Sequence, residues 1–546
     1  MLLVSALLFV TLLSGACSED VHQIFSGNVY AVVNTTYGAV RGQLVNSKVP
    51  NGGQYYIFKG IPYAKPPVGD LRFKAPVAHP AWSGVRDALE FGSPCVQQEN
   101  PGTGAEDCLF VSVSTPQLPG HGVTLKPVMV NIHGGGFTHG SGNTSPDRML
   151  QEGVVFVSLN YRLSVLGFLS VDSTVVSSNN GLKDQSLALR WVHANIARFG
   201  GDPAQVTIFG QSAGGASIEF QMLSPLSRGL FHRAISDSGS ALNPWAFLNS
   251  TADRAFALGK RMGHTTTDAT SLVKFLKSVS AQNLEKSVDP YNPFPPTLEY
   301  QHQQGSEVFL PEEPIMLLRQ GRYTQVPYIT GCNNKEQKDD PYVLQFISKP
   351  ELWKNVDMQR FIPDDLHLTR NSKLSEEIAA EMKKFYLGTG TPSAAEISSL
   401  VDVDSDQKFV TGIHRSIKQR LAHGNSHLYL YEFSYDGKLN QSKGKSPVKG
   451  AAHADDIAYL FHVYQKVSGI TENSTEAKVS QRMVKMWTNF VKYGNPTQGM
   501  TPAWLPSTKA SPAHLSIDAE TRLVREDLAA RRMAFWDKIY ASMHKV

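Results

Sequence analysis

Apolar runs separated by turn residues alternate with helical patterns through the first half of the chain. The runs Val128–Ile132, Val154–Leu159 and Val206–Phe209 are short, rich in β-branched or aromatic residues, and predicted to be buried strands. Before the third run a helix is predicted, with Asp184 as its N-cap and its end near Phe199. Strands that alternate with helices favour an α/β fold with a large, mostly parallel central sheet flanked by helices.

The second half of the chain contributes two more predicted strands, Val326–Thr330 and His427–Phe433. A late helix is indicated by apolar residues at helical spacing, and Gly494 and Pro496 are predicted to end it. Its apolar face consists of Met483, Met486, Trp487, Phe490 and Val491. Residues 340–425 have a less regular, partly helical pattern and are expected to form an insertion that covers the active edge of the sheet.

Composition excludes several classes of function. By length alone, 546 residues allow about three domains, but elaborated α/β folds also run this long as one unit. Hydrophobic residues make up 41% and charged residues 18%, as in ordinary globular proteins. The net charge is only +4 and basic residues are not clustered with aromatic ones, so nucleic acid is not an expected partner.

The first residues have the pattern of a secretory signal peptide. An apolar run from Leu2 to Leu13 precedes the small residues Ser14 to Ala16, and the run is too short to span a bilayer as a membrane anchor. We therefore expect a signal peptide at residues 1–18 and a single domain at 19–546. The last residues form neither a retention signal nor a hydrophobic tail, so the protein is predicted to be secreted and extracellular, without a membrane anchor.

Cysteines and glycosylation sequons agree with an extracellular location. Cys95 and Cys108 enclose a flexible loop, and an oxidising compartment favours a disulfide between them over two free thiols. Cys332 is then unpaired. The predicted glycosylation sites are the Asn-x-Ser/Thr sequons Asn34, Asn143, Asn249, Asn440 and Asn473.

A G-x-S-x-G sequence at residues 210–214 places Ser212 between a predicted strand and a predicted helix that begins near Gly215. A sharp strand-to-helix turn forces its middle residue into a strained conformation and needs glycine on both sides. Such a turn exposes the serine oxygen at a helix N-terminus, which favours developing negative charge. The alternative is a glycine-rich turn with a bystander serine.

Three consecutive glycines follow the strand that ends at Ile132. Their backbone N–H groups can approach a ligand closely, as in the oxyanion loops of lipases and esterases. We expect Gly135, Gly136 and Ala213 to form an oxyanion hole. The alternative, a phosphate-binding P-loop, is excluded because no Lys-Ser/Thr pair follows the glycines.

A serine nucleophile needs a base, and the base needs an acid that orients it. His453 lies in a loop of small residues, where its imidazole could reach the serine, and Glu336 follows a predicted strand at the edge where active sites of parallel sheets lie. The chain has 17 histidines, so spacing alone leaves both assignments open.

Together, these motifs resemble the type-B carboxylesterases, the carboxylesterase/cholinesterase family, and within it insect secreted esterases. The resemblance runs from about residue 25 to the C-terminus and includes Phe58–Ala64, Pro66–Gly69, Glu106–Leu109, Asn160–Arg162, Asp184–Gln185 and Gly200–Pro203. It implies an α/β-hydrolase fold with Ser212 as nucleophile, Glu336 as triad acid and His453 as triad base.

The resemblance also implies roles for residues outside the triad. Trp245 matches a tryptophan of the acyl pocket, and Cys95–Cys108 matches the first disulfide of the family. Two structural ion pairs are implied, Arg72–Glu106 and Arg162–Asp184. The chain departs from the family at Gln337, which often is Gly, and at Gln211, where cholinesterases have Glu. It also departs at Gly215, where juvenile hormone esterases often have Ala.

The predicted function is hydrolysis of neutral carboxylic esters through an acyl-enzyme, with a small-molecule ester as the substrate and no cofactor or metal. The loop Val96–Asp107 contains no aromatic residue, whereas the longer loop of cholinesterases carries a tryptophan that binds the choline cation. Choline esters are therefore expected to be poor substrates. The alternative is a catalytically silent adhesion or ligand-scavenging protein on the same fold, since fold alone does not fix function.

Overall fold

The computed structural model describes residues 23–25, 28–98, 102–171, 175–299, 307–461 and 467–543. The signal peptide expected at residues 1–18 lies outside these ranges. None of the helices in the described ranges is both long enough and apolar enough to cross a membrane.

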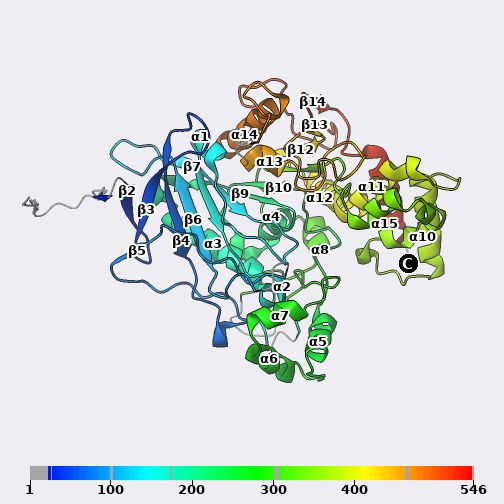
Figure 1. Cartoon of the computed structure of the whole chain (residues 1–546), viewed down its shortest axis with the longest axis horizontal. Helices are drawn as coiled ribbons and strands as arrows, with labels where there is room; N and C mark the ends of the chain where they lie inside the picture. Colours follow the sequence, from blue (N-terminus) through cyan, green and yellow to red (C-terminus); the bar gives the residue numbers. More distant parts are fainter. Residues whose placement is uncertain are drawn as a thin grey trace, which may run out of the picture.

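One mixed sheet of fourteen strands organises the described part of the chain, and Figure 1 shows it running across the molecule from β2 towards β14. The seven strands in the order β8-β7-β9-β10-β11-β12-β13 pair in parallel, while neighbouring strands on both sides of this block are antiparallel. The fourteenth strand, β5, pairs with β3. The strands are β1 Gln23–Phe25, β2 Asn28–Asn34, β3 Ala39–Asn46, β4 Gln54–Pro62, β5 Val85–Asp87, β6 Phe110–Thr115, β7 Lys126–Ile132, β8 Val155–Leu159, β9 Gly201–Gln211, β10 Arg233–Asp237, β11 Tyr328–Asn333, β12 Leu428–Phe433, β13 His514–Ile517 and β14 Thr521–Val524.

Helices cover both faces of the sheet. Successive side chains of a strand point to opposite faces, so Val128 and Val130 of β7 join one buried cluster with α3 and α4, while Met129 joins a second cluster with α13 and α14. The helices are α1 Asp147–Gln151, α2 Ser164–Phe168, α3 Asn180–Asn195, α4 Ala213–Leu223, α5 Ala252–Arg261, α6 Ala269–Ser278, α7 Ala281–Ser287, α8 Pro314–Arg319, α9 Pro341–Ser348, α10 Lys373–Tyr386, α11 Ile397–Ser405, α12 Thr411–Ala422, α13 Ile457–Phe461, α14 Thr475–Tyr493 and α15 Ala530–Met543.

The strands and the late helix that the pattern predicts are confirmed, with shifts at their ends; β9 is the largest case and begins five residues before the predicted Val206, at Gly201. β11 begins two residues later than predicted, at Tyr328, and Pro327 before it has no N–H for a ladder hydrogen bond. The N-cap prediction for Asp184 is wrong. Helix α3 begins at Asn180, and the Asp184 carboxylate inside it accepts hydrogen bonds from the side chain and backbone of Arg162.

The segment 340–425 contains α9 to α12 and short 3-10 turns, as its pattern indicates. Figure 1 shows α10 and α11 at the end of the molecule beyond β12, where the C-terminal α15 joins them. Between α11 and α12 the backbone forms a π-helical turn, Asp406–Val410. This turn brings the insertion to the carboxyl edge of the parallel strands, because Lys408 donates to the side chain of Gln337, close after β11.

Candidate active site

Ser212 occupies a strained turn between β9 and α4. Its φ is 60° and its ψ is −124°, a conformation that L-residues rarely adopt. The backbone segments around this turn lie too close together to leave room for side chains at the neighbouring glycines. A Cβ on Gly214 would lie 2.1 Å from the carbonyl oxygen of Ile132, and one on Gly210 would lie 2.4 Å from the backbone of Gly214. The G-x-S-x-G sequence therefore has a steric reason at both glycines.

The structure brings Ser212, His453 and Glu336 together from the ends of three different strands. Ser212 Oγ lies 2.8 Å from His453 Nε2, and His453 Nδ1 lies 2.6 Å from Glu336 Oε2. Glu336 lies in the loop after β11 and is fully buried, while His453 lies beyond β12. The backbone N–H of His453 also donates to the carbonyl of Glu336, at 2.9 Å. The side-chain and the backbone hydrogen bonds between His453 and Glu336 together fix the imidazole relative to the carboxylate.

Two residues that the sequence reasoning missed orient the Glu336 carboxylate. Its other oxygen, Oε1, accepts hydrogen bonds of 2.7 Å from the Ser238 hydroxyl and from the backbone N–H of Asn333. Ser238 directly follows β10, whereas Asn333 is the last residue of β11. A serine after a strand is too common a pattern to have indicated this contact from sequence.

The glycine loop after β7 presents free donors. Gly135 and Gly136 have φ values of 106° and 59°, in the region that favours glycine. Within the described residues, no hydrogen bond uses the N–H of Gly135, Gly136 or Ala213 as its donor. The three N–H groups remain available to a ligand beside Ser212, as an oxyanion hole requires.

A histidine and a tyrosine anchor this loop from behind. The His133 ring stacks on Tyr161 with 4.4 Å between centroids, and the Tyr161 hydroxyl donates to the His133 carbonyl at 2.9 Å. The His133 Nδ1–H donates to the Gly134 carbonyl at 2.8 Å. Burial lowers the pKa of His133 to about 4, so its imidazole stays neutral over the whole physiological range. His133 therefore acts as packing and a backbone anchor.

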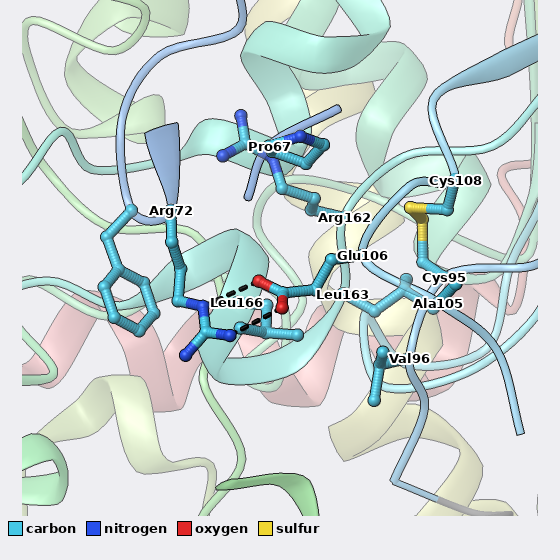
Figure 2. A pocket seen from close by; sticks show the side chains of 11 residues that line it. Pro67, Arg72, Cys95, Val96, Ala105, Glu106, Cys108, Arg162, Leu163 and Leu166 are labelled. Atoms are coloured by element: carbon cyan, nitrogen blue, oxygen red, sulfur yellow. Dashed lines mark hydrogen bonds and ion pairs between the residues drawn. A yellow bond between two sulfur atoms is a disulfide. The ribbon is translucent and has the colours of Figure 1, made fainter. Parts of the chain in front are cut away.

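The disulfide and both expected ion pairs are confirmed. Cys95 and Cys108 are joined, and Cys332 is buried with a free thiol. Figure 2 shows the disulfide beside Arg72 and Glu106, whose two hydrogen bonds measure 2.5 and 2.6 Å. Arg162 forms an equivalent two-bond contact with Asp184, at 2.7 and 2.8 Å, and both side chains are buried. The second ion pair joins the segment that follows β8 to helix α3.

Aromatic rings form one wall next to the triad. Phe409, from the π-helical turn, lies 4.5 Å from the His453 ring and 5.7 Å from Trp245, between centroids. Trp245 also approaches Phe137 of the glycine loop at 6.4 Å, and its Nε1–H donates to the Lys408 carbonyl at 2.8 Å. The expected acyl-pocket residue thus lies near the triad. Phe409 was not predicted because the irregular pattern of residues 340–425 does not show which of its side chains face the site.

Both glutamines that depart from the family pattern lie at the site. Gln211 Nε2 is 3.2 Å from His453 Nε2, so its amide shares that nitrogen with the Ser212 hydroxyl. Gln337 accepts a hydrogen bond of 2.8 Å from Lys408, and its N–H donates to the Ser405 hydroxyl. Gln337 thereby connects the loop of the triad acid to the insertion.

The five sequons differ in exposure. Asn34, Asn143, Asn249 and Asn473 are exposed. Asn440 is 4% exposed, and its amide donates to Tyr435 and Asp455 and accepts from Tyr459. A glycan on this nitrogen has no space in the folded chain, so the prediction for Asn440 is withdrawn.

Comparison with known proteins agrees with this geometry. The model of the carboxylesterase family matches residues 30–536. Juvenile hormone esterase of Tribolium castaneum is 32% identical over 93% of this chain and 94% of its own length, and esterase FE4 of Myzus persicae is 36% identical over 85% of each. The crystal structure of juvenile hormone esterase from Manduca sexta, with OTFP covalently attached, superposes with a TM-score of 0.82. That structure is 28% identical and covers 94% of this chain and 100% of its own.

The family model covers most of the chain, and the sheet, the disulfide and the relatives all agree with it. The chain therefore belongs to the carboxylesterase family and is a type-B carboxylic ester hydrolase with an α/β-hydrolase fold.

Proposed function

We propose that this carboxylesterase hydrolyses neutral esters through an acyl-enzyme, with Ser212 as nucleophile, His453 as general base and Glu336 as the acid that orients it. The observation that carries the proposal is the continuous chain of two short hydrogen bonds, Ser212 Oγ to His453 Nε2 at 2.8 Å and His453 Nδ1 to Glu336 Oε2 at 2.6 Å. A serine oxygen in contact with an oriented imidazole is the arrangement that activates a hydroxyl nucleophile.

In the first step, Ser212 Oγ attacks the ester carbonyl carbon while His453 Nε2 takes the hydroxyl proton. The carbonyl oxygen becomes an oxyanion, which the N–H groups of Gly135, Gly136 and Ala213 are placed to stabilise. The imidazolium then gives its proton to the departing alcohol, leaving an acyl group on Ser212. Water, deprotonated by His453, attacks this acyl group and releases the carboxylic acid.

The carboxylate of Glu336 is well suited to its role. It is fully buried, so water does not compete for its oxygens, and Ser238 and Asn333 hold one oxygen while His453 contacts the other. The Nδ1–H tautomer of His453 follows from this contact and leaves Nε2 unprotonated, so that it can accept the Ser212 proton. This complete triad argues against a catalytically silent protein.

The specificity for neutral esters rests on the walls of the site. The disulfide loop contributes no aromatic face, and Gln97 in it exchanges two hydrogen bonds with Gly140, which holds the loop against the end of the glycine loop. Trp245 and Phe409 supply an apolar wall, which we propose as part of the acyl pocket. A cation–π contact between a choline group and an aromatic face is worth about 2 kcal/mol when desolvated, or roughly thirtyfold in kcat/KM. A choline ester is expected to lack this contribution in a site whose disulfide loop has no aromatic residue.

Kinetic discrimination tests this specificity. The expected result is a kcat/KM for acetylthiocholine below that for an uncharged thioacetate of similar size. A clear preference for the choline ester would contradict the proposal of a neutral-ester site.

Secretion is the remaining part of the proposal. The Cys95–Cys108 disulfide favours an oxidising compartment. The four exposed sequons are the proposed glycosylation sites, at Asn34, Asn143, Asn249 and Asn473. Expression in insect cells tests both points, because the medium should contain enzyme whose mass falls on treatment with an N-glycosidase. Retention of unglycosylated enzyme inside the cells would contradict secretion.

Replacement of the nucleophile tests the mechanism. Ser212→Ala is expected to fold and to lose ester turnover by about 10⁶, as in other triads. Ser217→Ala, in helix α4 just after the turn that holds Ser212, is the matched control because the Ser217 hydroxyl contacts Gln185 and not His453. Turnover within tenfold of wild type in Ser212→Ala would contradict the mechanism, by the usual size of a triad effect.

A further inference from the structure

Two acids lie buried behind the triad and have no role in the mechanism above. Asp237 is the last residue of β10, and Asp456 follows His453 by three positions. Both side chains are completely buried. The hydroxyl of Tyr431, from β12, lies 2.5 Å from Asp237 Oδ1 and 3.5 Å from Asp456 Oδ2, so one phenol contacts both carboxyl groups.

The surroundings of the two acids lack a compensating cation. Within the described residues, no Lys or Arg side chain forms an ion pair with Asp237 or Asp456. The charged groups nearby are Glu336, which is also acidic, and His453, whose two nitrogens already contact Glu336 and Ser212. Two ionised carboxylates here would repel each other and Glu336, because all three side chains are buried away from the surface.

One oxygen of the pair requires a proton. Asp237 Oδ2 is buried and has no donor within reach in the described structure, while the neighbouring Asp456 can only accept when it is ionised. A proton on Asp237 resolves both problems, because the protonated carboxyl donates to Asp456. Burial, together with the nearby charge of Asp456, holds the pKa of Asp237 well above its ordinary value.

We propose that Asp237 and Asp456 share one proton and act as positioning residues, which connect the loop bearing His453 to the loop beneath Ser212. The connection runs through both partners. The carbonyl of Asp237 accepts the Ser212 N–H at 2.8 Å. The carboxylate of Asp456 accepts from the Asn333 amide at 3.1 Å, and that amide also donates to the Ala452 carbonyl, next to His453.

This arrangement explains why the acids occupy a position where apolar residues would cost less to bury. The carboxyl–carboxylate hydrogen bond joins two loops without adding a second negative charge beside the first. Only one of the two acids then adds its negative charge to that of Glu336 near His453. The inference extends the proposed triad, but the proton on the pair is a property of the resting protein and does not depend on turnover.

Infrared difference spectroscopy tests the shared proton. Wild-type protein minus Asp237→Asn should show the carbonyl stretch of a protonated carboxylic acid, and wild type minus Asp456→Asn should show the same band, since either amide removes the need for a proton. The double variant should remove no more absorbance than either single variant. Absence of the band in either difference spectrum would overturn the proposal, and so would a doubled loss in the double variant, which would show two protonated acids.

Kinetics test the positioning role. Asp237→Ala should lower kcat by at least about tenfold with a smaller change in KM, as small misplacements of catalytic groups do. Asp237→Asn, which can donate to Asp456 and accept from Tyr431, should recover most of that loss. Equal losses in both variants would contradict the positioning role. Since the infrared result requires no turnover, failure of the Ser212 mechanism would leave the band intact and is distinguishable.

Discussion

The ring of Phe409 lies 4.5 Å from the imidazole of His453, at an angle of 33°. Phe409 belongs to the π-helical turn between α11 and α12, and such turns often occur at functional sites. The insertion of residues 340–425 therefore contributes a wall directly to the triad. Removal of this ring opens space between the base and Trp245, where we place the acyl chain.

Phe409→Leu is predicted to shift the enzyme towards longer acyl chains. Each newly buried methylene contributes about 0.8 kcal/mol, or about fourfold in kcat/KM. The measurement is kcat/KM across a series from acetate to octanoate esters of one alcohol. Phe385→Leu is the control, because Phe385 stacks on Phe535 in the far helices. An unchanged chain-length profile in Phe409→Leu would show that the acyl chain lies elsewhere.

Glu336→Gln is predicted to lower kcat by about 10⁴, the usual effect of an amide that no longer fixes the histidine tautomer. Asp339→Asn, three residues further on, should have little effect because the Asp339 side chain forms a partly exposed ion pair with Lys445. Steady-state kinetics of the two purified variants provide the comparison. Similar losses in both would refute Glu336 as the triad acid.

Five of the seven parallel strands were predicted from the sequence, because buried strands such as Val128–Ile132 are continuous apolar runs. The other two, β10 and β13, were not predicted, since both are short and contain polar residues. Strands β1 to β6, which pair antiparallel apart from the β3–β5 pair, were not predicted. A strand with a partly exposed face mixes polar and apolar residues, and the first four positions of β3 alternate between partly exposed and buried. Asp184 was assigned as a cap because its type fits that role. Only the three-dimensional structure shows that Arg162 uses its carboxylate.

The complete triad could be assigned only with the help of the family resemblance, because spacing alone does not select one of the seventeen histidines as the base. Ser212 could be found from local sequence, because the tight turn around it requires glycine at positions 210 and 214 and so produces a recognisable short motif. The groups around Glu336 could not, because Ser238 and Asn333 meet only after β10 and β11 pair side by side. Long-range contacts of single polar residues leave no periodic signal.

Gln211→Glu is predicted to move the acidic limb of the kcat/KM profile to higher pH, by about one unit. A carboxylate 3.2 Å from His453 Nε2, where the amide now lies, favours the protonated imidazole, which cannot accept the Ser212 proton. Gln211→Met, which is neutral and of similar size, is the matched control and should keep the wild-type limb. If Gln211→Glu leaves the limb in place, Gln211 does not act on the base.

Glu285 is predicted to make the stability of the protein depend on pH. It is buried in α7, and burial raises its pKa from 4.5 to about 8. The folded state therefore binds this proton more tightly than the unfolded state, so the stabilisation is present below pH 4.5 and is lost as the pH rises to about 8.

Glu285→Gln keeps the shape of the side chain and cannot ionise. Its Tm relative to wild type should rise between about pH 5 and about pH 9 in thermal unfolding experiments. Glu351→Gln, at an exposed position, should show no such trend. A Tm difference for Glu285→Gln that is constant with pH would contradict the buried, protonated state.

Covalent labelling with an organophosphate tests the central claim, that Ser212 is the nucleophile of this carboxylesterase. After inactivation, the digested protein is mapped by mass spectrometry. The triad mechanism predicts one phosphoryl group per chain on Ser212, loss of ester turnover in proportion to the label, and no label on Ser212→Ala. Complete inactivation with the label on another residue, or full turnover by protein labelled at Ser212, would contradict it.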